Sequence, residues 1–358
     1  MGEYSFFLSI FNSLLYVLFY GAILVVRLLT NAISMKDLKA VWLFYPEGSG
    51  NFISRIGPWK YFLLTGSLDG LNNILVLISS AYLPGALIAL LNQTNVLFSM
   101  IAALLLLRSR FTFWEVWSVG LLFAGIAATL MPEFNDLHSL HSGLIHYSIM
   151  MGLSTLPQAV SVTLKEKLLR PQNPTTKGID LFVVNSHTSF FQMLLIPLFI
   201  PLTIPFDQTN GKPLDEYIRN GLRCFAGYTP PPNAFSSSVD PDISHCDLDP
   251  YPYIVYISIN LIYNVLILIL IKVASGVLCF MTLQAVLPLS VVLFYIHWPF
   301  IEVTPFSGWT VSGLVVGMVA LGLFQFFSVE KKKHRLSCLS CSLPAFDLYL
   351  DSKRTSRV

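Results

Sequence analysis

The chain has 358 residues, of which 54% are hydrophobic and only 12% are charged, and its formal net charge is +2. Soluble domains carry about 25% charged residues, so this composition excludes a soluble enzyme, a disordered chain and a small disulfide-rich domain. The net charge is too small to indicate a nucleic-acid partner. Hydrophobic residues fall into blocks of about 20, the helix length that crosses a hydrocarbon core. The sequence therefore predicts an all-α polytopic membrane protein.

Nine hydrophobic spans are expected, at 5–29, 61–82, 84–107, 112–132, 144–164, 181–203, 251–271, 274–298 and 307–329. The basic residues test this map, because cytosolic loops of membrane proteins are enriched in Lys and Arg. With nine spans, all but three of the 22 basic residues lie on one side of the membrane, and the exceptions are Lys212, Arg219 and Arg223. We therefore expect a cytosolic C-terminus and an N-terminus on the opposite side.

The loop 204–250 between the sixth and seventh spans is acidic and falls on the non-cytosolic side. It contains Cys224 and Cys246. Because that side permits disulfides, a bridge between the two cysteines is expected, with two free thiols as the alternative. Residues 213–223 have hydrophobic side chains at four-residue steps with charges between them, which is typical of a helix at a membrane surface. These hydrophobic residues are Leu214, Ile218 and Leu222.

Two stretches of the chain resemble each other. In the first, Gln93 precedes a glycine-spaced helix at 120–127, and in the second, Gln284 precedes a similar helix at 313–320. The order of features predicts an internal repeat, although glycine-rich apolar helices can also resemble one another by composition alone. The directions implied by nine spans make the two copies inverted, which is the usual architecture of secondary transporters.

The repeat divides the chain into a first half of four spans at 1–140 and a second half of five spans at 141–330. A basic cytosolic tail at 331–358 follows, and such a tail attracts anionic membrane lipids. The first half is one helix short of the second, so a helix is expected to be missing at its start.

The second span carries an acidic residue near its middle. Asp69 shares one helix face with Asn72 and Asn73. A carboxylate in hydrocarbon is costly, so it should face a partner or a water-filled cavity. Asp69 is therefore our leading candidate for binding a cationic group or carrying a proton, and a structural tie between helices is the alternative.

Further amides lie in four other spans. Each alone is more often a contact between helices than a ligand, but together they predict a polar central cavity for a small-molecule substrate. The candidate residues are Gln93, Asn95, Gln192, Asn260, Asn264 and Gln284, together with Asn72 beside Asp69 in the second span. The sequence has no P-loop, H-E-x-x-H or G-x-S-x-G motif, so it predicts no ATP-driven pump, no enzyme, and no cofactor or metal site.

The order of these features resembles that of the chloroquine-resistance-transporter family, within the drug/metabolite transporter superfamily, over about residues 4–329. The residues that carry the resemblance are Leu68, Asp69, Gly85, Gln93, Arg108, Arg110, Ser189–Gln192, Arg219–Gly221, Cys224, Asn260, Asn264 and Gln284. The resemblance implies ten helices in two inverted five-helix halves. It also implies a central cavity that opens alternately to an acidic lumen and to the cytosol, with amino acids, peptides or cationic drugs moving down a proton gradient.

Three departures from the family pattern bear on these implications. Residues 3–6 resemble the start of the family's second helix, which agrees with a missing first helix. The long loop has one cysteine pair where family members can have two. Lys272 stands near the place of a family carboxylate, whereas Glu166 resembles another and becomes the second candidate for proton coupling after Asp69.

The sequence thus predicts a secondary active transporter of small cationic or zwitterionic organic solutes, coupled to protons and working by alternating access. We expect it as a monomer in an acidic vacuole or endolysosomal membrane, or in a plastid membrane, with the solute, protons and membrane lipids as its partners. One alternative is an exchanger of nucleotide sugars or other anionic metabolites, which needs a cationic cavity residue for which Lys272 is the candidate. Another is a membrane scaffold that transports nothing.

Overall fold

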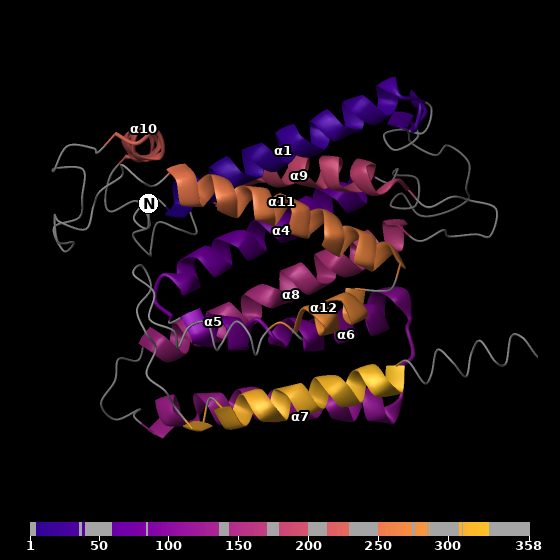
Figure 1. Cartoon of the computed structure of the whole chain (residues 1–358), viewed down its shortest axis with the longest axis vertical. Helices are drawn as coiled ribbons and strands as arrows, with labels where there is room; N and C mark the ends of the chain where they lie inside the picture. The colour runs from indigo at the N-terminus through magenta and orange to yellow at the C-terminus, as the bar shows by residue number, and fades with distance from the viewer. Residues whose placement is uncertain are drawn as a thin grey trace, which may run out of the picture. The chain divides into compact units, whose positions relative to one another are not determined.

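The computed structural model describes residues 5–35, 38–39, 59–83, 85–135, 143–169, 179–199, 213–228, 250–273, 276–284, 286, 308–309 and 311–328. The regular elements within these ranges are all helices (Figure 1). They are α1 (Ser5–Leu29), α4 (Trp59–Ser80), α5 (Gly85–Leu91), α6 (Thr94–Leu107), α7 (Phe113–Asn135), α8 (Gly143–Leu169), α9 (Leu181–Phe199), α10 (Leu214–Phe225), α11 (Pro250–Val273), α12 (Gly276–Gln284) and a helix at Val311–Ser328.

Six segments of the described residues are long and apolar enough to cross a membrane, judged by length and composition. They are Phe7–Leu29, Trp59–Ser80, Leu87–Leu107, Leu181–Phe199, Tyr253–Val273 and Val311–Ser328. Together with the all-helical architecture, they confirm a polytopic membrane protein. The number of nine spans stays a prediction, as does the drug/metabolite transporter fold.

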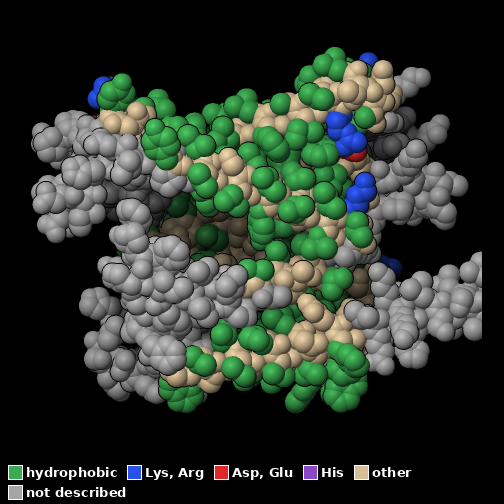
Figure 2. All heavy atoms as spheres, viewed as in Figure 1, with side chains coloured by type: hydrophobic (Ala, Val, Ile, Leu, Met, Phe, Trp, Pro, Cys, Tyr) green, Lys and Arg blue, Asp and Glu red, His purple; other side chains and the backbone are tan. Residues whose placement is uncertain are grey.

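The exposed surface of α11 indicates whether water or lipid surrounds these helices. Figure 2 shows hydrophobic side chains covering much of this helix. The side chains of Ile254, Val255, Ile259, Ile262, Leu266 and Val273 are each more than half exposed. A large apolar surface of this kind is unfavourable in water but suits contact with lipid tails.

The described chain forms two compact units. The first contains Met1–Ser109 and Ser139–Phe280, and the second contains Arg110–His138 and Met281–Val358. Each unit therefore draws on both of the halves expected at 1–140 and 141–330, whose repeat relationship stays a prediction.

Helix α4 lies at the centre of the first unit, where it packs on α8 and α9 (Figure 1). Helix α8 also packs on α6, and α1 packs on α9. The approach of α4 to α9 depends on Gly66, because a Cβ added there would lie 2.8 Å from the backbone oxygen of Thr188. Small residues permit such close backbone contacts between helices in membranes, where dispersion contacts hold the helices together.

The third expected span, 84–107, is interrupted. Helix α5 ends at Leu91 and α6 begins at Thr94, with Asn92 and Gln93 in a turn between them. The hydroxyl of Thr94 donates to the carbonyl of Leu91 at 2.8 Å. Side chains of this kind compete with the helical hydrogen bonds of the backbone, which accounts for a break at a run of polar residues.

Helix α10 confirms the helix that was predicted at 213–223, but its buried face differs from the expected one. Tyr217, Gly221 and Cys224 are buried, whereas the side chain of Leu222 is 53% exposed. The buried residues pack against Phe7 of α1, and a Cβ at Gly221 would lie 2.8 Å from its ring. Cys246 lies outside the described residues, so the Cys224–Cys246 bridge stays a prediction.

The second unit contains a close contact between two glycine-rich helices. A Cβ added at Gly125 of α7 would lie 2.9 Å from the carbonyl oxygen of Gly313 and 3.3 Å from the nitrogen of Gly317.

Helix α7 starts with a capping box. Thr112 N–H donates to a carboxylate oxygen of Glu115 at 2.6 Å, and Glu115 N–H donates to the Thr112 hydroxyl at 3.4 Å. This reciprocal pairing satisfies donors at the start of a helix.

Candidate functional site

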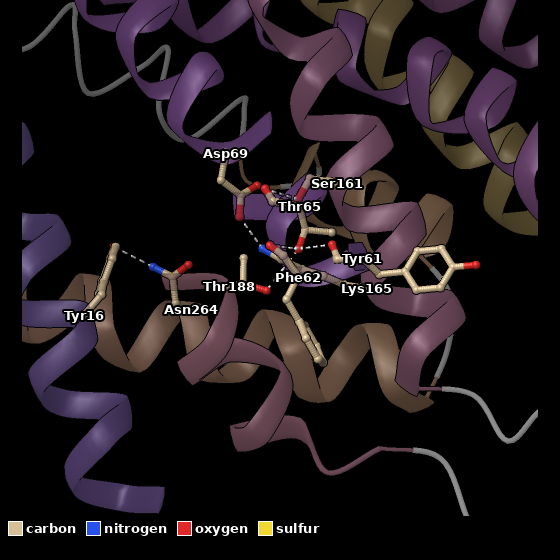
Figure 3. Close-up of polar contacts among 9 residues, drawn as sticks. All are labelled: Tyr16, Tyr61, Phe62, Thr65, Asp69, Ser161, Lys165, Thr188 and Asn264. Atoms are coloured by element: carbon tan, nitrogen blue, oxygen red, sulfur yellow. Dashed lines mark hydrogen bonds and ion pairs between the residues drawn. The ribbon is translucent and has the colours of Figure 1, made fainter. Parts of the chain in front are cut away.

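Two charged side chains inside the first unit form an ion pair. Lys165 of α8 donates to a carboxylate oxygen of Asp69 in α4 at 2.6 Å, and the two side chains point toward each other in Figure 3. The side chain of Asp69 is 18% exposed and that of Lys165 is 11% exposed. The expectation that Asp69 faces a partner is therefore met, and that partner is a cation that sequence reasoning had placed in a cytosolic connection.

The long extent of α8 explains this partner. The helix continues to Leu169, beyond the expected end at 164, so Lys165 lies within the helix. Helices α4 and α8 run antiparallel, since Ser79 contacts Met151 at one end and Ser161 donates to the Thr65 carbonyl at 3.4 Å further along. In this alignment the backbone of Lys165 lies beyond that of Ser161, so its side chain must extend back toward the middle of α4 to reach Asp69.

Small hydroxyl side chains join the helices on which the pair stands. The hydroxyls of Thr65 in α4 and Thr188 in α9 lie 3.1 Å apart, and both are buried. Ser161 of α8 donates to the Thr65 carbonyl and is also buried (Figure 3). These neutral contacts hold α4, α8 and α9 together, because buried hydroxyls keep their partners in a membrane interior.

A second polar group joins α1 to α11. Asn264 donates to the Tyr16 hydroxyl at 2.9 Å and to the side-chain oxygen of Asn260 at 2.8 Å, and the Tyr16 hydroxyl donates to that same oxygen. The structure therefore brings together two of the predicted site residues, Asn260 and Asn264. Figure 3 draws Tyr16 and Asn264 in one view with the Asp69–Lys165 pair.

Tyr16 was missed by sequence reasoning. The sequence does contain a pattern that could have identified it. Asn12, Tyr16 and Tyr20 follow one another at four-residue steps, so they form a polar stripe along one face of α1. We name Asp69, Lys165, Tyr16, Asn260 and Asn264 the inner polar cluster. All five residues belong to the first unit.

On α1 and α4, two buried amide oxygens lack a hydrogen-bond partner. They are the side-chain oxygens of Asn12 in α1 and Asn72 in α4, and these two helices contact each other. Buried polar atoms in proteins are almost always hydrogen-bonded to protein or to water. The two oxygens therefore have acceptor capacity that a solute or water can use, and Asn72 is one of the predicted site residues.

Asn95 contacts α8. Its amide donates to the side-chain oxygen of Gln158 in α8 at 2.9 Å, next to a 2.9 Å contact between the hydroxyls of Thr94 and Thr155. These bonds tie α6 to α8. The side-chain oxygen of Asn95 is buried without a hydrogen-bond partner, so a further acceptor remains there.

Fewer contacts are described for the other predicted amides. Gln93 and Gln192 are both buried, and the side chain of Gln192 lies 3.9 Å from a Cβ built on Gly70. The side chain of Gln284, at the end of α12, lies outside the described residues.

Within the described part of the chain, no group of three or more His, Cys, Asp and Glu side chains could hold a metal ion.

Glu166 is buried beside the start of α12. Its carboxylate accepts a hydrogen bond from the backbone N–H of Gly276 at 2.7 Å. A negative charge at this position is favourable, because the first N–H groups of a helix are unpaired and carry partial positive charge. The contact gives Glu166 a structural role in addition to the proton coupling that was expected of it.

Apolar helices of membrane length, with a charged pair and amides held among them, define a polytopic membrane protein with polar groups in its interior. The sequence model of the CRT-like family, described as chloroquine-resistance transporter-like, matches residues 1–325. The chain belongs to that family. The family is named for transporters, which agrees with the expectation that the chain is not an enzyme.

The related proteins come from organisms of different kinds. Crt homolog 1 of Dictyostelium discoideum is 28% identical over 352 residues, covering 92% of this chain and 69% of that protein. The chloroplastic protein CLT3 of Arabidopsis thaliana is 26% identical over 331 residues, covering 89% of this chain and 66% of that protein. The chloroquine resistance transporter of Toxoplasma gondii is 26% identical over 247 residues, covering 66% of this chain and 27% of that protein. The chain thus spans just under two thirds of the length of CLT3.

Proposed function

We propose that this protein is a secondary active transporter that moves small cationic or zwitterionic organic solutes across an organellar membrane, coupled to protons. The observation that carries the proposal is the Asp69–Lys165 ion pair within the helices of the first unit, at 2.6 Å. Family membership supports transport in general, and the ion pair supports this particular substrate class.

The energy of such a pair argues for a function. Removing two charges from water costs several kcal/mol for each ion, and the attraction between them often does no more than offset that cost. A hydrophobic contact would hold α4 to α8 as well. Ionisable groups inside a membrane protein are therefore hypotheses for a solute or proton site by default.

The charges of the inner polar cluster favour a cationic or zwitterionic solute. Within this cluster Lys165 is matched by Asp69, and the remaining members Tyr16, Asn260 and Asn264 are neutral hydrogen-bonding groups. Lys272, the cation that an exchanger of anionic metabolites would need, lies in the last turn of α11 and is exposed. The positions of both lysines make that alternative less favourable.

In our proposal, Asp69 accepts the coupled proton, and Glu166 is the second residue that can do so. A proton on Asp69 removes the charge that holds Lys165, so the contact between α4 and α8 weakens and the bundle can change its conformation. Asn72, Gln93, Asn95, Gln192, Asn260, Asn264 and Gln284 would then supply hydrogen bonds to the solute. Rocking of the two inverted halves, 1–140 and 141–330, would expose the solute to each side in turn.

An acidic vacuole or endolysosomal membrane suits this coupling, because a proton gradient exists across it. The chloroplastic relatives from Arabidopsis thaliana support a plastid membrane as the alternative. We expect the transporter to act as a monomer, with a Cys224–Cys246 bridge in the loop on the lumenal side.

The test is uptake by the purified full chain in proteoliposomes. Amino acids, short peptides and cationic drugs would be offered at two external pH values. We expect Asp69→Asn to abolish the dependence of uptake on the pH gradient. Asp215→Asn is the matched control, because Asp215 is 75% exposed on α10 and should leave that dependence intact. Unchanged pH dependence in Asp69→Asn would remove the role assigned to Asp69.

A further inference from the structure

Proton coupling gives Asp69 a role, but it does not explain why the partner of Asp69 is a lysine. We propose that Lys165 recognises a carboxylate of the transported solute, which replaces Asp69 as the partner of its ammonium group. The inference rests on the proposed function and narrows it, since the solute must then carry a carboxylate as well as an amino group.

The direction of the Lys165 side chain is the first argument. Lys165 is the fifth residue from the end of α8. A lysine near the end of a membrane helix ordinarily extends its ammonium outward to the aqueous boundary. Here the side chain extends inward to Asp69, the eleventh of 22 residues in α4, and is 11% exposed. The chain therefore places a cation where a solute in the bundle would meet it.

Charge balance is the second argument. When the solute opens the pair and Asp69 is not protonated, two poorly solvated charges are left, and each of them then needs a new partner. A simple cation can pair with Asp69 but leaves Lys165 unmatched, and a simple anion does the reverse. A zwitterion supplies both partners at once, with its carboxylate at Lys165 and its ammonium at Asp69. The exchange conserves charge, because one internal ion pair is replaced by two charge-assisted contacts.

Spare acceptors near α4 supply the third argument. The side-chain oxygens of Asn12 and Asn72 are buried and lack a hydrogen-bond partner. An ammonium group has three N–H donors, so one can point at Asp69 while another points at Asn72, which lies three residues further along the same face of α4. Acceptors around Asp69 and a donor at Lys165 form a site with two chemically different ends, which fixes the orientation of an amino acid or a peptide end.

A tie between helices is the competing explanation of the pair, and it predicts a different result. A tie affects stability and overall uptake but does not distinguish between solutes. The decisive measurement is therefore the preference for a solute over the same solute without its carboxylate. Suitable pairs are histidine with histamine and arginine with agmatine, each at one fixed pH.

The experiment uses the full chain in proteoliposomes for uptake and in detergent for binding, with thermal stabilisation by each compound as the binding signal. We expect Lys165→Gln to reduce the preference for the carboxylate-bearing member on the order of tenfold, the scale of a lost hydrogen bond to a charged group. Lys165→Arg should keep most of the preference. Lys167→Gln is the matched control, because the ammonium of Lys167 lies over the Tyr61 ring at 5.6 Å.

Loss of Lys165 alone leaves Asp69 unpaired, so the double variant Asp69→Asn with Lys165→Gln is also needed. It removes both charges and should fold while showing no carboxylate preference. A preference that survives in Lys165→Gln or in the double variant would overturn the inference and leave the proposed function standing. If the protein binds solutes in a carboxylate-dependent way but takes up none of them, the proposed transport function is overturned. The role of Lys165 in recognising the carboxylate is then supported.

Discussion

Gly66 of α4 lies so close to Gln192 of α9 that an added Cβ would stand 2.7 Å from the backbone nitrogen of that residue. The Cβ of Phe191 and the carbonyl oxygen of Thr188 would both be 2.8 Å away. These atoms belong to the backbone or adjoin it, so they cannot rotate out of the way. Because Asp69 lies three residues after Gly66, this contact also fixes where the carboxylate stands.

Gly66→Ala should destabilise the protein by about 1–3 kcal/mol, the usual cost of overpacking. Gly21→Ala is the matched control, because a Cβ at Gly21 in α1 meets no atom within 4 Å. Alanine is favoured over glycine inside a helix by up to about 1 kcal/mol, so this variant should be as stable as the original or more so. Thermal unfolding in detergent distinguishes the two, and equal midpoints would contradict the close packing.

The ion pair predicts a non-additive pair of substitutions. Lys165→Gln alone should lower stability by up to about 3 kcal/mol, because it leaves the Asp69 carboxylate without its counter-charge. Asp69→Asn with Lys165→Gln should recover most of that loss, since both partners are then neutral. Unfolding of the single and double variants measures the coupling. Additive effects would show that the two side chains do not depend on each other.

Most of the helices follow from hydrophobic blocks of membrane length, as at 5–29 for α1 and 61–82 for α4. The Asp69–Lys165 contact could not be predicted in this way, because it joins residues 96 positions apart. Three consecutive charged residues, Lys165 to Lys167, have the composition of a loop. Tertiary contacts keep them helical, since Lys165 bonds to Asp69 and Glu166 to Gly276.

The amides show a similar limit. Their presence inside the spans was evident from the sequence, but their partners depend on how each helix is rotated. Asn260 and Asn264 lie one turn apart on one face of α11, and both contact Tyr16. Asn95 was grouped with them, yet it bonds to Gln158. A periodicity identifies a face of one helix, and it does not identify which neighbour that face meets.

Tyr16→Phe tests the contact between α1 and α11. The change removes the hydroxyl that bonds to Asn260 and Asn264 and keeps the ring. We expect a loss of about 1 kcal/mol in stability and a reduced uptake rate. Tyr251→Phe is the control, because Tyr251 is 70% exposed at the start of α11. Uptake that is equal in the two variants would exclude Tyr16 from the site.

Glu166 offers a final test, which separates its structural contact from proton coupling. Glu166→Gln keeps a side-chain oxygen that can accept the Gly276 N–H, so the unfolding midpoint should change little. Glu166→Ala leaves that N–H buried and unpaired, which costs about 1–3 kcal/mol, and its midpoint should fall. If Glu166 also carries the transported proton, Glu166→Gln will lose pH-dependent uptake while remaining folded. Stability and uptake of the same two variants therefore give independent answers, and equal midpoints would show that the Gly276 contact does not stabilise the start of α12.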